Sequence, residues 1–215
     1  MLRVLVTGFT PFGDAAVNPS ELVVRALAAH PPPGIDLAAA VLPVTYAGAL
    51  PALCAALARH APHAVLATGL AGGRPHIAVE RVAINIDDAR IPDTDGVRRI
   101  DAAVVAGGPA GYFATVPIKA IAAAIRAAGV PAEVSQSAGT FLCNHVFYQC
   151  SHIAATARSG MRVGFLHLPW LPEQAAQHPG EPGIAFADML LGLRAALAAL
   201  RDTGADLAVA EGAVS

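Results

Sequence analysis

The sequence predicts an α/β protein in which a mostly parallel sheet lies between layers of helices. Segments with the pattern of strands alternate along the chain with segments that have the pattern of helices. Most of the strand segments are continuous apolar runs, as expected of strands buried on both faces. The 215 residues suffice for one sizeable core, and no repeat or linker divides them. We therefore expect one domain over residues 1–201 and a frayed tail at 202–215.

The first half of the chain supplies four predicted strands and two predicted helices. Residues 2–7 form a short β-branched apolar run. In the segment NPSE that follows, Asn18 is placed as a helix cap, Pro19 at the first helical position and Glu21 three residues after the cap. This helix should end near Ala29, before HPPPG. The next predicted elements are a strand at 37–44, a helix at 47–59, a strand at 63–69 that ends in the glycine-rich turn GLAGG, and a strand at 76–85.

A long polar segment separates the two halves. Residues 86–101, IDDARIPDTDGVRRID, are the most polar stretch of the chain and predict a functional loop. Pro117 then opens a helix that Gly129 ends. The remaining predicted elements are a strand at 132–137, a helix from Leu142 to about Arg158, a strand at 162–168, a loop at 171–183 and a helix at 184–200.

Composition argues against two classes of partner. The net charge is -2, Lys119 is the only lysine and the arginines are scattered, so no basic stripe is available to follow a nucleic-acid backbone. The longest uncharged apolar run, 37–58, contains Pro43, Gly48 and Pro51, and it indicates a strand, a turn and a helix better than a membrane span. Because no signal-peptide pattern precedes the first turn, we expect a soluble cytoplasmic protein.

Of the three cysteines, Cys143 is placed where a thiol can react. No CxxC pair is present, which argues against a disulfide framework and a structural zinc site. Cys54 and Cys150 lie within helical patterns and are expected to fill apolar space. Cys143, in QSAGTFLCNHVFYQC, lies where a polar, glycine-bearing segment meets a helix. Free N–H groups and the dipole at a helix start favour a thiolate, so Cys143 is a candidate nucleophile.

A thiol nucleophile needs a base, and His167 is the best-placed histidine. It ends the apolar strand RVGFLHL, at the edge where the carboxyl ends of strands gather. His145 is two residues from Cys143 and should face another way. Glu80, in IAVERVAIN, needs a partner there and is suited to orient an imidazole. A lone histidine on an apolar strand is more often a buried core residue. The catalytic combination of Cys143, His167 and Glu80 is therefore a hypothesis, and a purely structural His167 is the alternative.

Metal and nucleotide sites have weaker support. CNH together with His152 lacks the spacing of a closed zinc site. TGFTPFG follows a strand but is not GxGxxG, and its two phenylalanines stand where a phosphate loop needs bare backbone. GLAGGR could cradle an anion, so a nucleotide-binding module remains an alternative.

Four groups of segments carry a resemblance to a known family: VLVTGFTPFG with NPSE, GLAGGRPHIAVERVAINIDDARIPDTDG, SAGTFLCNHVFY and HLPWLPEQ. Taken together, they resemble the successive signature blocks of pyroglutamyl peptidase I, a family of cytosolic cysteine exopeptidases. The blocks occur in the family's order from residue 4 to about 175. The resemblance implies a single-domain α/β/α sandwich with a mixed, twisted sheet, no metal or organic cofactor, and a homotetramer. It also implies that the substrates are peptides with an N-terminal pyroglutamate.

The resemblance also implies roles for individual residues. Cys143 matches the nucleophile, His167 the general base and Glu80 the acid that orients it. Arg90, in DDARIPD, matches an arginine near the reacting centre, which makes it the oxyanion candidate together with the Cys143 amide; a salt bridge with Asp87 or Asp88 is the alternative. A neutral five-membered lactam requires a small apolar pocket with a few polar groups. The residues implied to line it are Phe9, Phe12, Asn18, Thr45, Ile91, Phe141 and Leu142.

One position departs from the family, and one further alternative stays open. Leu70 stands where the family often has glutamine, so a side-chain amide is absent from the turn after the third strand. Another α/β cysteine hydrolase or amidotransferase-like enzyme, acting on a different amide, is the main competing function. FLCNH lacks the glycines that normally flank the cysteine of a nucleophile elbow, which argues against that alternative.

Overall fold

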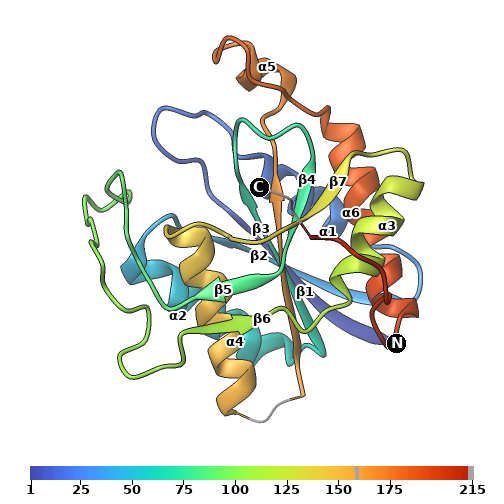
Figure 1. The fold of residues 1–215 in the computed structure, drawn as a ribbon, viewed down its shortest axis with the longest axis horizontal. Helices are drawn as coiled ribbons and strands as arrows, with labels where there is room; N and C mark the ends of the chain where they lie inside the picture. Colours follow the sequence, from blue (N-terminus) through green and yellow to red (C-terminus); the bar gives the residue numbers. More distant parts are fainter. Residues whose placement is uncertain (158–159, 213–215) are drawn as a thin grey trace.

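The computed structural model describes residues 1–157 and 160–212, and its main element is a six-stranded sheet (Figure 1). The strands are β1 (Leu2–Phe9), β2 (Ile35–Leu42), β3 (Ala64–Leu70), β4 (Ile77–Glu80), β7 (Ala132–Ser135) and β8 (Arg162–Leu168). Their order across the sheet is β2-β1-β3-β8-β4-β7. Strands β2, β1, β3 and β8 are parallel to one another, β4 is antiparallel to β8, and β7 is parallel to β4. The prediction of a mostly parallel, mixed sheet is therefore confirmed.

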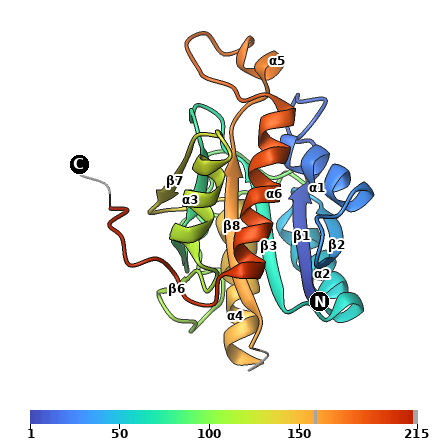
Figure 2. The ribbon, with the colours of Figure 1, turned by 90° about the vertical axis from the view of Figure 1, so that its right-hand side faces the viewer.

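Helices cover both faces of this sheet, which confirms the α/β/α sandwich (Figures 1 and 2). On one face lie α1 (Pro19–Ala29), α3 (Ile118–Ala127) and α6 (Phe186–Asp202); on the other lie α2 (Tyr46–His60) and α4 (Leu142–Thr156). Val6 of β1 belongs to the first core and Leu5 to the second, because successive side chains of a strand point to opposite faces. A short helix, α5 (Pro172–Ala175), lies within the predicted loop at 171–183. In the described part of the chain, no helix is long and apolar enough to cross a membrane.

The end of β1 and the start of α1 approach each other closely, and this contact positions the loop between them. A Cβ atom on Gly8 would lie 2.5 Å from the backbone oxygen of Ser20, so only glycine fits there. The backbone N–H of Phe9 donates to Ser20 Oγ at 2.9 Å. As predicted, Asn18 caps the helix by accepting from the N–H of Ser20 at 3.0 Å.

The predicted strand at 76–85 is wrong as a single element, because the chain changes sheets within it. β4 ends at Glu80, and β5 (Val82–Ile84) pairs with β6 (Gly111–Phe113) in a separate two-stranded sheet. The alternating pattern continues through the change and does not reveal it. The sequence also did not predict β6, whose three residues are too short to show a period. The change of sheet leaves Glu80 at the end of a strand in the main sheet.

The predicted frayed tail contacts α3 within its described part, residues 203–212, and residues 213–215 lie outside the described part of the chain. The carboxylate of Asp206 accepts from the backbone N–H groups of Lys119 at 3.0 Å and Ala120 at 2.9 Å, in the first turn of α3. The cap position of that helix is Pro117, which provides no side-chain acceptor. A distant residue thus supplies the cap that the helix's own sequence lacks.

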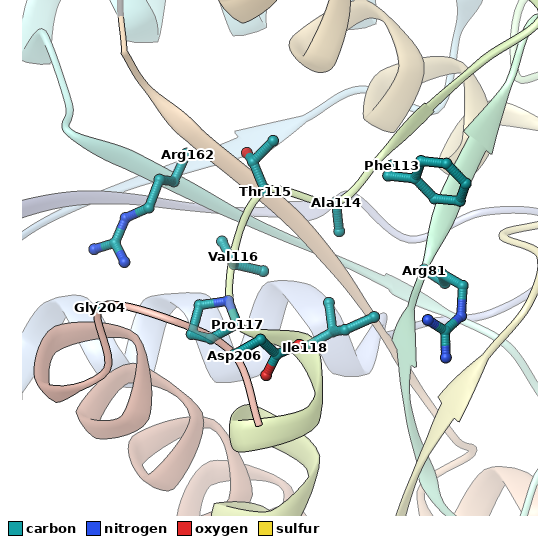
Figure 3. Close-up of a pocket in the computed structure, with 10 residues that line it drawn as sticks. All are labelled: Arg81, Phe113, Ala114, Thr115, Val116, Pro117, Ile118, Arg162, Gly204 and Asp206. Atoms are coloured by element: carbon teal, nitrogen blue, oxygen red, sulfur yellow. The ribbon is translucent and has the colours of Figure 1, made fainter. Parts of the chain in front are cut away.

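A surface pocket of about 340 Å³ lies where this tail meets the start of α3, and Arg81 and Arg162 both line it (Figure 3). Both guanidinium groups already have partners, since Arg81 Nε donates to Gln136 Oε1 at 2.7 Å and Arg162 Nη2 donates to the backbone oxygen of Leu200 at 3.1 Å. None of the predicted site residues lines the pocket. We therefore place the candidate site elsewhere.

Replacing Asp206 with alanine is expected to lower the free energy of unfolding by about 1 kcal/mol, because two N–H groups of α3 lose their acceptor. Asp202→Ala is the matched control, since its exposed carboxylate bonds to the neighbouring Arg201; this substitution should leave the free energy of unfolding essentially unchanged. Urea unfolding followed by circular dichroism measures both. Equal effects of the two substitutions would contradict the capping role.

Candidate active site

Cys143 and His167 come together at the carboxyl ends of β3 and β8. His167 lies beside Gly69 in the register of these two strands. A Cβ atom on Gly69 would lie 2.6 Å from Cys143 Sγ, so the sulfur rests directly against the glycine backbone. Cys143 lies close enough to His167 to raise the pKa of its imidazole. Segments that are far apart in the sequence thus bring a thiol and an imidazole into contact.

The position of Cys143 in α4 gives its sulfur a favourable environment for a negative charge. The helix begins at Leu142, and Phe141 at the cap position forms no side-chain hydrogen bond to the first turn. Among the described residues, no side chain is seen to cap the first N–H groups of the helix, where Cys143 lies. These groups and the helix dipole stabilise an anion, whether it is the thiolate or an oxyanion formed next to it.

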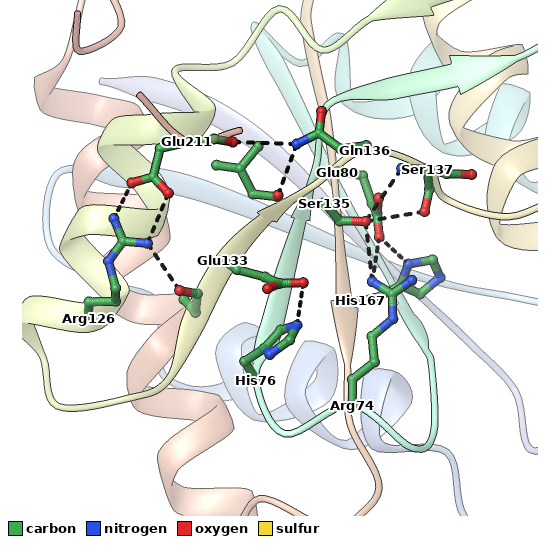
Figure 4. Close-up of polar contacts among 12 residues, drawn as sticks. Arg74, His76, Glu80, Arg126, Glu133, Ser135, Gln136, Ser137, His167 and Glu211 are labelled. Carbon is green, nitrogen blue, oxygen red and sulfur yellow. Dashed lines mark hydrogen bonds and ion pairs between the residues drawn. The ribbon is translucent and has the colours of Figure 1, made fainter. Parts of the chain in front are cut away.

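Glu80 is completely buried and bonds to His167 (Figure 4). Its Oε1 atom lies 2.7 Å from His167 Nδ1 and 3.3 Å from Arg74 Nη1. Because Nδ1 of the imidazole is used for this bond, Nε2 remains for Cys143. The second oxygen, Oε2, is buried and has no hydrogen-bond partner among the described residues. The arrangement is an acid, an imidazole and a thiol in series.

The charges around His167 favour its protonated form. Burial by itself would lower the pKa of the imidazole. The negative charge of Cys143, the hydrogen bonds to Cys143 and Glu80, and the charge of Glu80 outweigh burial and raise this pKa to about 9. At neutral pH the imidazole of His167 is therefore protonated, which is the form that can donate a proton to a leaving group.

The other two cysteines differ from each other in exposure. Cys150 is fully buried, as predicted, and burial raises its pKa to about 12. The expectation that Cys54 fills apolar space is wrong, because its side chain is exposed on α2. The apolar letters around Cys54 do not reveal which helix face is exposed, since alanine is common on both faces.

Several of the residues implied to line a lactam pocket lie on the same side of the sheet as Cys143. The rings of Phe12 and Phe141 are 5.7 Å apart. Phe9 and Leu142 are buried in the core between the sheet and the helices α2 and α4, and Phe12, Phe141 and Cys143 pack against that core. The structure therefore brings four apolar side chains from two distant segments to the same core as Cys143.

The three remaining pocket candidates and Arg90 differ in how they are held. Asn18 and Thr45 cap helices, and the Thr45 hydroxyl accepts from the N–H of Gly48 at 3.0 Å. Ile91 is 51% exposed, and Arg90 is exposed without a hydrogen bond or ion pair to any described residue. The guanidinium of Arg90 is thus not committed to a structural partner.

A buried ion network that the sequence did not predict anchors the polar loop at 86–101. Asp87 is fully buried, and its Oδ2 atom lies 2.9 Å from both Arg99 Nη1 and His145 Nδ1. The arginine that pairs with Asp87 is thus Arg99 and not Arg90. Arg99 also lies over the ring of Tyr46, 4.5 Å from its centroid. His145 faces Asp87, which ties the loop to α4 two residues beyond Cys143.

The glycine-rich turn after β3 provides close packing. A Cβ atom on Gly72 would lie 2.0 Å from Trp170 Cε2, so a side chain at that position would overlap the indole. Together with the contact between Gly69 and Cys143, this accounts for two glycines of GLAGGR without an anion. The arginine that ends this motif, Arg74, contacts Glu80, and the sequence analysis did not assign it to the site.

The described residues include no group of three or more His, Cys, Asp or Glu side chains arranged to hold a metal ion. His152, considered above with CNH, instead lies with Nδ1 2.8 Å from the hydroxyl of Tyr112.

Comparison with known proteins identifies relatives over nearly the whole chain. The family model described as pyroglutamyl peptidase matches residues 2–203. The pyrrolidone-carboxylate peptidase of Streptomyces coelicolor is 52% identical over 99% of both chains, and that of Cupriavidus taiwanensis is 51% identical over 96% of both. The crystal structure of pyroglutamyl peptidase I from Bacillus amyloliquefaciens superposes with a TM-score of 0.94 at 35% identity, covering 97% of this chain and 99% of that one.

Iodoacetamide is expected to alkylate Cys143 at least tenfold faster than Cys54 at pH 7, although Cys54 is the more exposed thiol. The reason is that alkylation requires the thiolate, which the helix start and His167 favour at Cys143. Peptide mass mapping at short times measures both rates, with Cys54 as the internal control. A faster reaction at Cys54 would remove the basis for a reactive Cys143.

Proposed function

The chain belongs to the pyroglutamyl peptidase family, and from this premise we propose that it removes N-terminal pyroglutamate from peptides by cysteine catalysis. The observation that carries the assignment of roles is the series of Glu80, His167 and Cys143, in which Glu80 Oε1 lies 2.7 Å from His167 Nδ1. We assign Cys143 as the nucleophile, His167 as the acid and base, and Glu80 as the group that orients the imidazole.

The first half of the reaction forms a thioester. Cys143 Sγ attacks the pyroglutamyl carbonyl carbon, and the electron pair of the C=O bond moves to oxygen. Backbone N–H groups at the start of α4 and the uncommitted guanidinium of Arg90 stabilise this oxyanion. The C–N bond then breaks, and protonated His167 gives its proton to the leaving amine. The shortened peptide departs and neutral His167 remains beside the thioester.

The second half of the reaction regenerates the enzyme. Neutral His167 accepts a proton from water, whose oxygen attacks the thioester carbonyl carbon. The C–S bond breaks, free pyroglutamate leaves, and the thiolate and imidazolium are restored. Glu80 stays ionised throughout and keeps Nδ1 of the imidazole protonated, so that Nε2 remains the atom that carries the proton to and from the substrate.

The apolar side chains beside Cys143 are the proposed lactam pocket. Pyroglutamate has no charged α-amine, and a flat five-membered ring fits between aromatic faces such as those of Phe12 and Phe141. Phe9 and Leu142 form the base of this pocket, and Ile91 on the exposed loop closes it. Asn18 and Thr45 belong to the same proposal, with their polar groups near the lactam in addition to their capping roles.

We extend the proposal to assembly and location. A homotetramer in the cytoplasm fits a chain whose three thiols are all free and whose surface exposes Phe113 and Ile100, at 72% and 63%. Light scattering of the purified chain distinguishes a tetramer from a monomer of 21.8 kDa.

The purified chain is expected to release free pyroglutamate from a peptide blocked by it and to hydrolyse a pyroglutamyl arylamide. Cys143→Ser and His167→Ala should lower kcat by at least about 10³-fold, because each removes one member of a group that acts as a unit. Cys54→Ser is the matched control and should retain full activity. Circular dichroism of all three variants verifies folding. A folded Cys143→Ser variant with normal turnover would refute the nucleophile.

The pH profile of kcat/KM is expected to fall above about pH 9, because His167 then loses the proton that the leaving amine needs. Glu80→Gln removes a hydrogen bond and a charge that both raise the pKa of His167, so this limb should move to lower pH. Rates on the arylamide between pH 5 and 10.5 measure this alkaline fall in the wild type and in Glu80→Gln. If the alkaline limb stays at the same pH in Glu80→Gln, Glu80 does not control the pKa of His167.

A further inference from the structure

Arg74 is the second cation that contacts the buried carboxylate of Glu80. Its Nη1 atom lies 3.3 Å from Glu80 Oε1, the oxygen that also accepts from His167 (Figure 4). The same Nη1 atom lies 3.3 Å from the hydroxyl of Ser135, which in turn donates to the backbone oxygen of Ser137. The guanidinium is thereby held between the ends of β4 and β7.

Arg74 brings charge to the interior at little desolvation cost. Its side chain is 32% exposed, whereas that of Glu80 is fully buried. A pocket of about 260 Å³ borders Arg74 and Ser135 on the outer side, so water reaches the guanidinium. An arginine keeps its proton at every accessible pH, and its positive charge is therefore constant through a catalytic cycle.

Charge counting shows when this constant cation is needed. Before the reaction, the thiolate of Cys143 and Glu80 are negative and His167 and Arg74 are positive, so these four groups sum to zero. After His167 has given its proton to the leaving amine, the thioester and the imidazole are both neutral, and Glu80 is balanced by Arg74 alone. Without Arg74, that state would contain a buried carboxylate with no cationic partner, which is strongly unfavourable.

We propose that Arg74 is a positioning residue for the proposed reaction, compensating the charge of Glu80 so that this carboxylate holds His167 in both its protonated and its neutral state. The inference rests on the proposed function. It goes beyond the series of three side chains because it makes the end of the GLAGGR turn a part of the machinery. Arg74 acts through Glu80 and does not contact the reacting atoms.

The proposal has a direction that pH measurements can detect. The charged and titratable groups that act directly on His167 are Cys143 from α4 and Glu80 from β4, and Arg74, from the turn before β4, contacts Glu80. Beside them, His76 Nε2 lies 2.6 Å from Glu133 Oε1 of β7. Removing the positive charge of Arg74 leaves Glu80 free to favour the imidazolium, so the pKa of His167 rises. A weaker acid transfers its proton more slowly to the leaving amine.

Arg74→Gln is therefore expected to lower kcat by about 10- to 100-fold with KM within about twofold, and to move the alkaline limb to higher pH. Arg74→Lys should restore part of kcat because it restores the charge. Arg81→Gln is the matched control, since Arg81 follows Glu80 directly and bonds instead to Gln136; its kcat and limb should equal those of the wild type.

A double variant tests whether Arg74 acts through Glu80. Once Glu80→Gln has removed the carboxylate, Arg74→Gln should cost less than about twofold more, because no charge is left to compensate. The proposal would be overturned if the fold-losses of kcat in the two single variants multiply in the double variant. It would also be overturned by a folded Arg74→Gln variant with normal kcat and an unmoved alkaline limb. If Arg74→Gln fails to fold, Ser135→Ala tests the proposal instead. Loss of the hydroxyl that holds Arg74 should also move the alkaline limb to higher pH, by a smaller amount.

Nuclear magnetic resonance titration of His167 separates this inference from the proposed function. The ring of His167 should titrate at higher pH in Arg74→Gln than in the wild type, whichever amide the enzyme cleaves. An unchanged titration would refute the role of Arg74 even if the wild type releases pyroglutamate. A shifted titration in a chain that releases none would support Arg74 and refute the substrate.

Discussion

The buried carboxylate of Glu80 is the constraint on which the geometry of the site depends. A fully buried carboxylate without partners is costly by several kcal/mol, so the chain must bring donors to it. The antiparallel placement of β4 beside β8 brings His167 Nδ1 to 2.7 Å, and the turn that precedes β4 brings Arg74 to 3.3 Å. The same pairing directs the imidazole toward Cys143. Stability and chemistry therefore impose the same arrangement on this edge of the sheet.

Close backbone contacts hold the groups around that carboxylate in place. Gly69 lets the sulfur of Cys143 lie against β3, and Gly72 leaves room for Trp170. On the other side of the site, Asp87 anchors the polar loop to α4 through Arg99 and His145 while Arg90 stays exposed. The reacting groups thus lie on strands and at a helix start, whereas Arg90 lies on a loop that Asp87 anchors.

Patterns in the sequence predicted the reactive residues better than they predicted the contacts between distant segments. The alternation of elements predicted the sandwich, and Asn18 predicted the start of α1, because both depend on local periodicity and capping. Cys143 at a helix start and His167 at a strand end followed from the same local rules, and the resemblance added their roles. Cys54 was wrongly expected to be buried, because an alanine-rich helix does not show which face it exposes. The division of 76–85 between two sheets was missed because alternation continues across it.

By itself, then, the sequence determined most of the segments that form strands and helices, which residues carry reactive groups, and which family the chain resembles. These properties depend on neighbours within a few positions, or on motifs whose letters stay in order. Only the tertiary structure decided that Arg74 meets Glu80, that Asp87 joins Arg99 to His145, and that Asp206 caps a helix 87 residues before it. Each of these contacts joins segments brought together by sheet order and chain crossing. No local pattern encodes such pairings, because the free energy that selects them comes from burying the sheet and its charges as a whole.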